Sequence, residues 1–233
     1  MSFLDHLEEL RWRIIISFIG IAAGTIISWI FIDYIVEDIL LYPALKHSIK
    51  LQNIQPFGQL VLYLKVAIII GIIISIPNIF YQIWKFISPA LKENEKKYIF
   101  SIVLFSSLCF FAGIMFAYYI MLPFTLKFIN VFGTDSVENN FSLDLYFDII
   151  LSIMLAAGVV FELPMLSFFL SKIGILKPEF MRKFRKHSIV VILVIAAFLT
   201  PGTDPVAQIL LAIPLLILYE ISIFVSKYSQ KKV

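Results

Sequence analysis

The chain has 233 residues, of which 61% are apolar and only 15% charged, and its mean hydropathy is +0.95. The core of one water-soluble domain of this length cannot bury so much apolar surface. The composition therefore excludes a soluble globular protein and indicates an integral membrane protein. The formal net charge of +3 is small, and it requires no nucleic-acid partner.

Long apolar segments predict the membrane spans. A helix needs about 20 apolar residues to cross a hydrocarbon core of roughly 30 Å. The sequence gives spans at about 14–35, 61–87, 98–123, 145–171, 187–200 and 206–226. The first is too long for the apolar part of a signal peptide and has no small-residue cleavage site behind it, so we expect it to stay as an anchor. This pattern predicts an all-α integral membrane protein with six transmembrane helices, in which residues 1–233 form a single transmembrane domain.

The distribution of lysine and arginine predicts the orientation of these helices, because basic residues accumulate in cytoplasmic loops. Fifteen of the nineteen basic residues fall on one side, and the other side holds only Lys46, Lys50, Lys65 and Lys127. Six spans with both termini in the cytoplasm satisfy this distribution. The basic segment 181–186, MRKFRK, is also typical of a loop that lies against anionic lipid.

Motifs of enzymatic and metal chemistry are missing from the sequence. The single cysteine, Cys109, lies inside the third span, and the histidines His6, His47 and His187 are scattered. There is no HExxH, GxSxG, Walker or paired-cysteine motif. We therefore expect no enzyme activity, no metal site and no cofactor.

Proline and glycine residues occur inside the spans and at their ends. Four prolines interrupt or end them: Pro77, Pro123, Pro164 and Pro214. Pro123 is expected to end the third span, and each interior proline removes a backbone hydrogen bond and bends its helix, which leaves concavities. The alternative is that neighbouring helices satisfy the freed carbonyl and no concavity results. Gly20 and Gly24 give the first helix a small-residue face for close helix contact.

One carboxylate stands in an otherwise apolar span. On an ideal helix Glu162 shares a stripe with Asp144 and Asp148 and lies about 21 Å from Asp148 along the axis. A charged side chain facing lipid costs at least a few kcal/mol. We infer that Glu162 faces a groove or a partner, or is protonated. The alternative is a hydrogen bond to a neighbouring helix and no further role.

The fifth span is short. Residues 187–199 rise only about 20 Å as a helix and cannot cross the hydrocarbon core. The turn 200–205, TPGTDP, would then lie below the outer surface, where a thinned bilayer or burial against protein accommodates it. Either result fits a concave, partly wet membrane face beside Glu162. The alternative is a helix longer than its apolar run, with the turn in water.

Acidic residues occur at two points on the predicted cytoplasmic surface. Segment 3–14 forms an amphipathic helix leading into the first span, and its polar side holds Asp5, Glu8 and Glu9. The connection after the second span places Phe86 beside the membrane and carries Glu93 and Glu95. These acids could clamp a dibasic ligand, because carboxylate and guanidinium pair bidentately. The alternative is that they serve a helix amino terminus and balance nearby lysines.

Five segments that run almost from end to end of the chain, in matching order, resemble the TatC family, the core subunit of the twin-arginine protein translocase. They are HLEELRWRI (6–14), YQIWKFISPALKENEKK (81–97), FAYYIMLPF (116–124), FELPM (161–165) and LTPGTDPVAQILLAIPLLILYEI (199–221). The resemblance implies a curved, glove-like and concave arrangement with short fifth and sixth helices, in the cell (inner or plasma) membrane. It implies a receptor for twin-arginine signal peptides that exports folded proteins using the proton-motive force. The implied partners are single-span TatA and TatB type subunits and further copies of the chain in the complex.

The resemblance also implies roles for two groups of residues. In the signal-peptide group, the arginine-binding carboxylates and their supporting side chains are Glu9, Glu95, Phe86, Arg11 and Lys97. In the second group, Glu162 lies in the groove and Pro43 matches a position used in translocation. Gln208 and Asp204 lie near the outer tip where partner helices dock. The turn that contains them, TPGTDPVAQ, is longer than the compact versions in the family.

Two other classes of function stay open at the level of sequence. A small proton-coupled secondary transporter would use Glu162 to take and release the coupling proton, although the internal symmetry typical of such carriers is not visible. A purely structural scaffold would tolerate replacement of Glu162 and Glu95. A receptor binds a peptide through Glu9 and Glu95, whereas a transporter moves a small solute without a protein partner.

Overall fold

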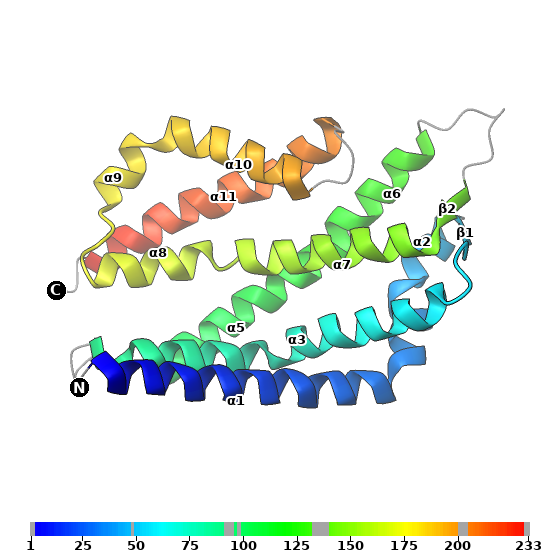
Figure 1. Cartoon of the computed structure of the whole chain (residues 1–233). Helices are drawn as coiled ribbons and strands as arrows, with labels where there is room; N and C mark the ends of the chain where they lie inside the picture. Colours follow the sequence, from blue (N-terminus) through cyan, green and yellow to red (C-terminus); the bar gives the residue numbers. More distant parts are fainter. Residues whose placement is uncertain are drawn as a thin grey trace. The chain divides into compact units, whose positions relative to one another are not determined.

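The computed structural model describes residues 3–47, 49–90, 96, 99–131, 140–199 and 205–230. The chain divides into two compact units. The first comprises residues 1–108 and 140–147, and the second comprises residues 109–139 and 148–233. Helices make up nearly all of both units (Figure 1). The predicted all-α membrane fold is confirmed, while the glove-like shape of the whole stays a prediction.

Four helical stretches in the described part of the chain are long and apolar enough to cross a membrane. They are Leu4–Ile30, Gly58–Ile87, Ile99–Lys127 and Leu143–Lys172, and they match the first four predicted spans. Helix α10 (Arg185–Leu199) has 15 residues and rises only about 22 Å, so the fifth helix is short as expected. Helix α11 (Pro205–Gln230) has 26 residues and is longer than the short sixth helix that the resemblance implies. The crossing of the membrane by these last two helices stays a prediction.

The first unit is organised around a pair of helices, and the beginnings of α5 and α7 also belong to it. Its other elements are α1 (Phe3–Ile30), the π-helical η1 (Tyr34–Leu40), α2 (Tyr42–Lys46), β1 (Lys50–Gln52), α3 (Gly58–Ile87), the short 3-10 turn η2 (Ser88–Ala90) and β2 (Asn140–Ser142). As predicted, the amphipathic segment runs without a break into the first span, because α1 begins at Phe3 and continues to Ile30.

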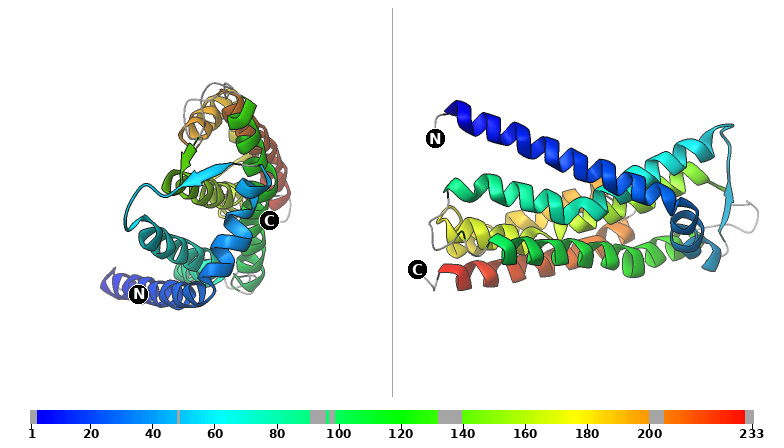
Figure 2. Two further views of the ribbon diagram at one scale, coloured as in Figure 1. Left: turned by 90° about the vertical axis from the view of Figure 1, so that its right-hand side faces the viewer. Right: turned by 90° about the horizontal axis from the view of Figure 1, so that it is seen from below.

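Helices α1 and α3 lie side by side with their backbones in contact (Figures 1 and 2). A Cβ atom built on Gly24 would lie 2.6 Å from the carbonyl oxygen of Gly71, and one on Gly71 would lie 2.5 Å from the backbone nitrogen of Thr25. Only glycine allows so close an approach. The hydroxyl of Ser75 also donates to the carbonyl oxygen of Gly20 at 2.7 Å. The predicted small-residue face of the first helix is therefore confirmed, and α3 is its partner.

A short sheet closes one end of the first unit. Strands β1 and β2 pair in parallel, with Leu51 opposite Phe141, and appear as cyan and green arrows in the left view of Figure 2. The hydroxyl of Tyr146 donates to the carbonyl oxygen of Leu40 at 2.9 Å. The sequence analysis did not predict these strands, because three-residue strands carry no measurable periodicity.

The second unit holds the later elements of the chain. They are the remainder of α5 (Ile99–Phe116), the π-helical η3 (Ala117–Met121), α6 (Leu122–Val131), the remainder of α7 (Leu143–Val160), α8 (Leu163–Lys172), α9 (Pro178–Lys183), α10 and α11. Helix α11 packs against α8, α9 and α10. The side chains of Ser171 on α8 and Ser226 on α11 share a hydrogen bond of 2.5 Å.

The four prolines have different effects on the helices that contain them. The prediction that Pro123 ends the third span is wrong, because α6 begins at Leu122 and continues to Val131, and proline is tolerated in the first turn of a helix. Pro77 and Pro214 lie inside continuous helices and interrupt neither. Pro164 does mark a break, since α7 ends at Val160 and α8 begins at Leu163.

Candidate functional site

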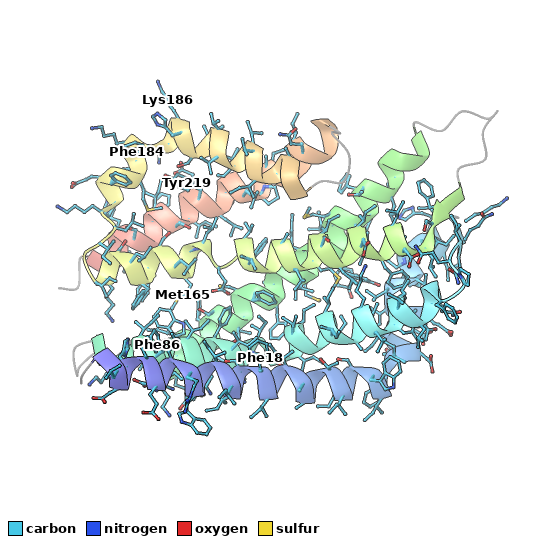
Figure 3. All side chains as sticks on the ribbon, viewed as in Figure 1. Phe18, Phe86, Met165, Phe184, Lys186 and Tyr219 are labelled. Carbon is cyan, nitrogen blue, oxygen red and sulfur yellow. The ribbon has the colours of Figure 1, made fainter. Side chains whose placement is uncertain are left out.

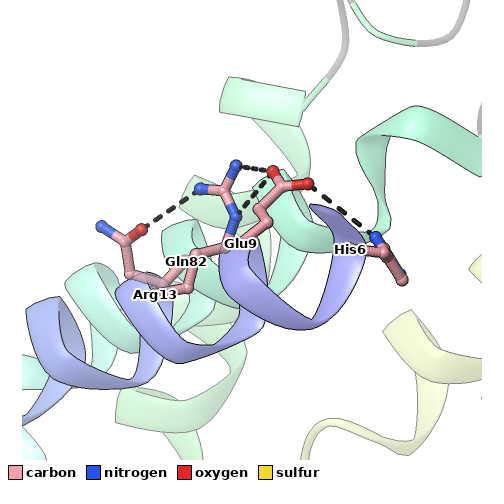
Figure 4. Close-up of polar contacts among 4 residues, drawn as sticks. All are labelled: His6, Glu9, Arg13 and Gln82. Atoms are coloured by element: carbon pink, nitrogen blue, oxygen red, sulfur yellow. Dashed lines mark hydrogen bonds and ion pairs between the residues drawn. The ribbon is translucent and has the colours of Figure 1, made fainter. Parts of the chain in front are cut away.

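The clearest polar site in the first unit surrounds Glu9 on the first turns of α1 (Figure 4). Arg13 lies one turn further along the same helix, and its Nε donates to Glu9 Oε1 at 3.1 Å. Its Nη2 also pairs with the same oxygen. Spacing of four residues with the acid nearer the helix amino terminus is the favourable order for such a pair. Both side chains are largely shielded from solvent, with 22% of Glu9 and 14% of Arg13 exposed.

Arg13 connects this ion pair to the neighbouring helix. Its Nη1 donates to Gln82 Oε1 on α3 at 3.4 Å. Gln82 is buried and donates in turn to Asn78 Oδ1 at 3.4 Å. Asn78 donates to the backbone carbonyl of Ile16 on α1, also at 3.4 Å. This polar ladder spans the contact between α1 and α3, so Arg13 and therefore Glu9 are held in place by a packed helix pair.

The second carboxylate oxygen of Glu9 has a different environment. Oε2 is shielded from solvent, and no described residue donates a hydrogen bond to it. Nδ1 of His6 lies 3.8 Å from Oε2. The His6 ring stacks on Phe86 from the end of α3, with 4.4 Å between ring centroids and 15° between planes. Figure 3 labels Phe86 at this end of the unit.

This arrangement suits a planar cation. One oxygen of Glu9 is already bound by a guanidinium, and the other retains its capacity to accept hydrogen bonds. A guanidinium from a ligand could donate to Oε2 and lie against an aromatic ring, which an ammonium does less well. His6 lies beside that oxygen, with Nδ1 3.8 Å away, so we expect such a ligand to displace the imidazole.

The structure brings some of the predicted peptide-binding residues together. Glu9 and Phe86 meet through His6. Arg11 does not join them, since it lies about 200° around the helix from Glu9 and is 66% exposed, with its guanidinium 3.9 Å from the carboxylate of Glu8. The predicted site residues Glu95 and Lys97 lie outside the described residues.

Three residues of this site were missed in the sequence analysis: His6, Arg13 and Gln82. The spacing of Glu9 and Arg13 was a visible signal for an ion pair within one helix. The spacing of His6 and Glu9 likewise placed them on one face. Gln82 was a polar residue in an apolar helix, a signal of the same kind as Glu162.

The second predicted group is more dispersed. Glu162 is buried, with 8% exposed, and immediately precedes α8. The helix on which the stripe of Asp144, Asp148 and Glu162 was predicted is interrupted, because α7 ends at Val160 and Glu162 lies just before α8, so the stripe stays a prediction. The thiol of Cys109 lies within electrostatic range of the Glu162 carboxylate.

Gln208 lies in a hollow between α10 and α11. Its Nε2 donates to the carbonyl oxygen of Leu193 at 2.8 Å, and the hollow of about 280 Å³ is otherwise lined by apolar residues of α10: Val190, Leu193, Val194 and Ala197. Glu162 is not among the lining residues. Pro43 is buried in α2 of the first unit, and Asp204 lies outside the described residues.

No group of three or more His, Cys, Asp or Glu side chains suitable for a metal ion occurs among the residues that the structure describes. The polar chemistry of the described site is therefore that of one carboxylate with guanidinium, imidazole and amide neighbours. Fold and site together define a helical membrane protein that crosses the bilayer several times and carries a carboxylate site at the end of two of its helices.

Comparisons with known proteins identify the family. The family model described as Sec-independent protein translocase protein (TatC) matches residues 5–214. The chain is 40% identical over 232 residues to the TatC protein of Carboxydothermus hydrogenoformans, covering 100% of this chain and 95% of the relative. It is 41% identical to the TatC protein of Aquifex aeolicus, covering 100% and 97% respectively. The chain therefore belongs to the TatC family of Sec-independent protein translocase proteins.

The fold agrees with this assignment. A crystal structure described as the twin-arginine translocase receptor TatC superposes with a TM-score of 0.85 at 41% sequence identity, covering 97% of this chain and 99% of that one. A second structure, of the same receptor in detergent, has the same TM-score and covers 94% and 98%. The resemblance read from the sequence is confirmed, and the family favours a translocase component over a small-solute transporter.

Proposed function

We propose that this protein is the receptor for twin-arginine signal peptides in a translocase that exports folded proteins, and that Glu9 binds one of the two arginines. The observation that carries the proposal is the state of the Glu9 carboxylate. Oε1 is held by Arg13, whereas Oε2 accepts no hydrogen bond from a described residue. A receptor for a dibasic motif requires a carboxylate oxygen that can still accept hydrogen bonds, on a rigid support.

The surrounding residues support discrimination of arginine from lysine. Arg13 and Gln82 fix the direction of the carboxylate, so a planar guanidinium can approach it in one geometry. Phe86 offers an aromatic face on which a guanidinium stacks. We extend the site to Glu95 for the second arginine and to Lys97 and Arg11 as peripheral supports, on the basis of the family resemblance.

The proposal includes the setting in which this receptor works. Both termini lie in the cytoplasm, as the distribution of basic residues favours, so that the Glu9 end of α1 meets signal peptides before export. Single-span TatA and TatB type subunits and further copies of the chain complete the translocase, which uses the proton-motive force. Gln208, in the hollow between α10 and α11, is the polar residue that we assign to partner docking.

The test is binding of a fluorescent signal peptide to the purified full chain, comparing paired arginine with paired lysine. Glu9→Gln keeps the shape of the side chain and removes its charge, and we expect it to weaken binding of the arginine peptide by about tenfold or more, as expected for a charge-assisted hydrogen bond. Glu8→Gln is the matched control, because Glu8 is an exposed carboxylate on the same turn with its own arginine neighbour. Glu95→Gln tests the second carboxylate in the same assay.

The result that contradicts the proposal is equal weakening by Glu8→Gln and Glu9→Gln, since general attraction between acidic and basic segments would then explain binding. Equal affinity for the two peptides would contradict the assigned role of the guanidinium. Neither result would change the family to which the chain belongs.

A further inference from the structure

The connection between α8 and α10 forms a basic surface in the second unit. Between residues 173 and 187 the sequence has five cations and one acid, Glu179. Four of the cations are exposed: Lys177, Arg182, Lys183 and Lys186. Among the described residues none of these four forms an ion pair, so their charges are available to a ligand. Figure 3 labels Lys186, which lies at the beginning of α10.

This basic surface rests on a fixed support. The hydroxyl of Tyr219 on α11 donates to the backbone carbonyl of Met181 in α9 at 2.8 Å. The remaining cation of the segment, Arg185, binds Glu220 on α11 at 2.6 Å. Met181 is buried. Residues 181–185 are therefore attached to α11. This attachment fixes the orientation of the basic surface.

Aromatic side chains accompany the free cations on the outward side. Phe180 and Phe184 contact each other with ring centroids 4.4 Å apart, and Phe184 contacts His187 at 5.3 Å. Phe180 is 55% exposed. Phe184 separates α9 from α10, and backbone hydrogen bonds from Phe184 to Phe180 and from Ser188 to Phe184 join the two helices.

Two groups of side chains can be distinguished in the segment. Met181 and Arg185 are held against α11. Lys183 and Lys186 are exposed, and each lies next in the chain to a member of the aromatic cluster, Phe184 or His187. Exposed cations next to aromatic rings are typical of a segment lying at a membrane interface.

The position of the segment along the chain also indicates that it lies at the membrane interface. The membrane-capable stretch Leu143–Lys172 ends immediately before it, so the chain leaves the hydrocarbon core there. Ile175, which is 72% exposed, lies between that end and α9. Residues this close to the end of a span lie at the level of the lipid headgroups, where exposed apolar side chains can enter the bilayer and cations meet phosphate.

We propose that residues 175–187 form a binding site for anionic phospholipid headgroups, with Lys183 and Lys186 contacting the phosphate region and Phe180 inserted beside the acyl chains. An acidic protein partner would use the cations but has no need of Phe180 and Ile175 on the same surface. This site is independent of the Glu9 site, which belongs to the other unit.

The experiment measures binding of fluorescent phosphatidylglycerol and fluorescent phosphatidylcholine to the full chain in mixed micelles. Two lysines close to an anionic lipid contribute about 1 kcal/mol each, so Lys183→Gln/Lys186→Gln should weaken phosphatidylglycerol binding on the order of tenfold or more. Lys46→Gln/Lys50→Gln removes the same charge from exposed lysines of the first unit and should leave the affinity within twofold. Phe180→Ser should weaken the binding that persists at high salt, because screening removes only the electrostatic part.

Three results would overturn this proposal. The first is equal affinity of the parent protein for the two lipids. The second is an equal loss in the two double-lysine variants, which would indicate a response to net charge alone. The third is displacement of the lipid by soluble glycerol phosphate at the same concentration as unlabelled phosphatidylglycerol, which would make the surface a site for free phosphate. A melting temperature equal to that of the parent shows that the Lys183→Gln/Lys186→Gln variant is folded.

Discussion

His6 stacks on Phe86 with 4.4 Å between ring centroids while its Nδ1 lies 3.8 Å from Glu9 Oε2. One imidazole thus contacts the end of α3 and the carboxylate of α1 at the same time. The oxygen nearest to it is the one to which no described residue donates a hydrogen bond. We therefore expect a ligand that binds Glu9 to displace His6.

Replacing His6 should make the Glu9 carboxylate easier to reach. His6→Ala removes the ring beside Oε2, so we expect the arginine signal peptide to associate several times faster, measured by stopped-flow fluorescence. The loss of the stack should also lower stability by about 1 kcal/mol. His187→Ala is the control, because it removes a histidine that contacts an aromatic ring in the other unit. An unchanged or slower association in His6→Ala would show that the imidazole does not cover the site.

Arg13 positions the Glu9 carboxylate. Arg13→Gln removes the guanidinium that holds Glu9 Oε1, so peptide affinity should fall a few-fold. The same change removes the ion pair with Glu9, and a double-mutant cycle with Glu9→Gln should give a coupling of about 1 kcal/mol in stability. Arg185→Gln is the matched control, since that arginine also pairs with a glutamate but belongs to the other unit. A rise in peptide affinity in Arg13→Gln would instead mean that its charge repels the arginines of the peptide.

The contact between α1 and α3 should tolerate no side chain at Gly24. The added methyl group of Gly24→Ala would lie 2.6 Å from the carbonyl oxygen of Gly71, so the helices must separate or shift. We expect a loss of about 1–3 kcal/mol in stability and weaker peptide binding, because Gln82 moves with α3. Ala23→Leu, at the exposed residue that precedes Gly24, serves as control in the same thermal denaturation assay. A melting temperature unchanged by Gly24→Ala would contradict the close packing.

Replacing Glu162 should distinguish signal-peptide binding from the later steps of translocation. It is buried in the second unit, so Glu162→Gln should leave signal-peptide affinity unchanged. Export of a folded reporter protein from cells should fall if the carboxylate acts during translocation. Solute flux in liposomes containing only the purified chain would support the transporter alternative, and normal export in Glu162→Gln would leave the buried carboxylate a structural role only.

Local properties of the sequence determined much of this protein. Whether a segment crosses the bilayer depends on its own transfer free energy, so four spans and the short fifth helix were predictable from apolar content. The break at Pro164 depends on a missing N–H and a steric clash within one turn. The prediction that Glu9 and Phe86 belong to a peptide-binding site came from residue type and position along the chain, together with the family resemblance.

Tertiary structure decided which of these groups meet. The register between α1 and α3 decides that Gly24 meets Gly71 and that Arg13 meets Gln82. No local rule specifies that register. The pairing of β1 with β2 joins segments almost ninety residues apart in sequence. The stack of His6 on Phe86 likewise exists because packing brings the two helix ends together. Periodicity and solvation act within one element, whereas partner choice depends on the free energy of packing one element against another.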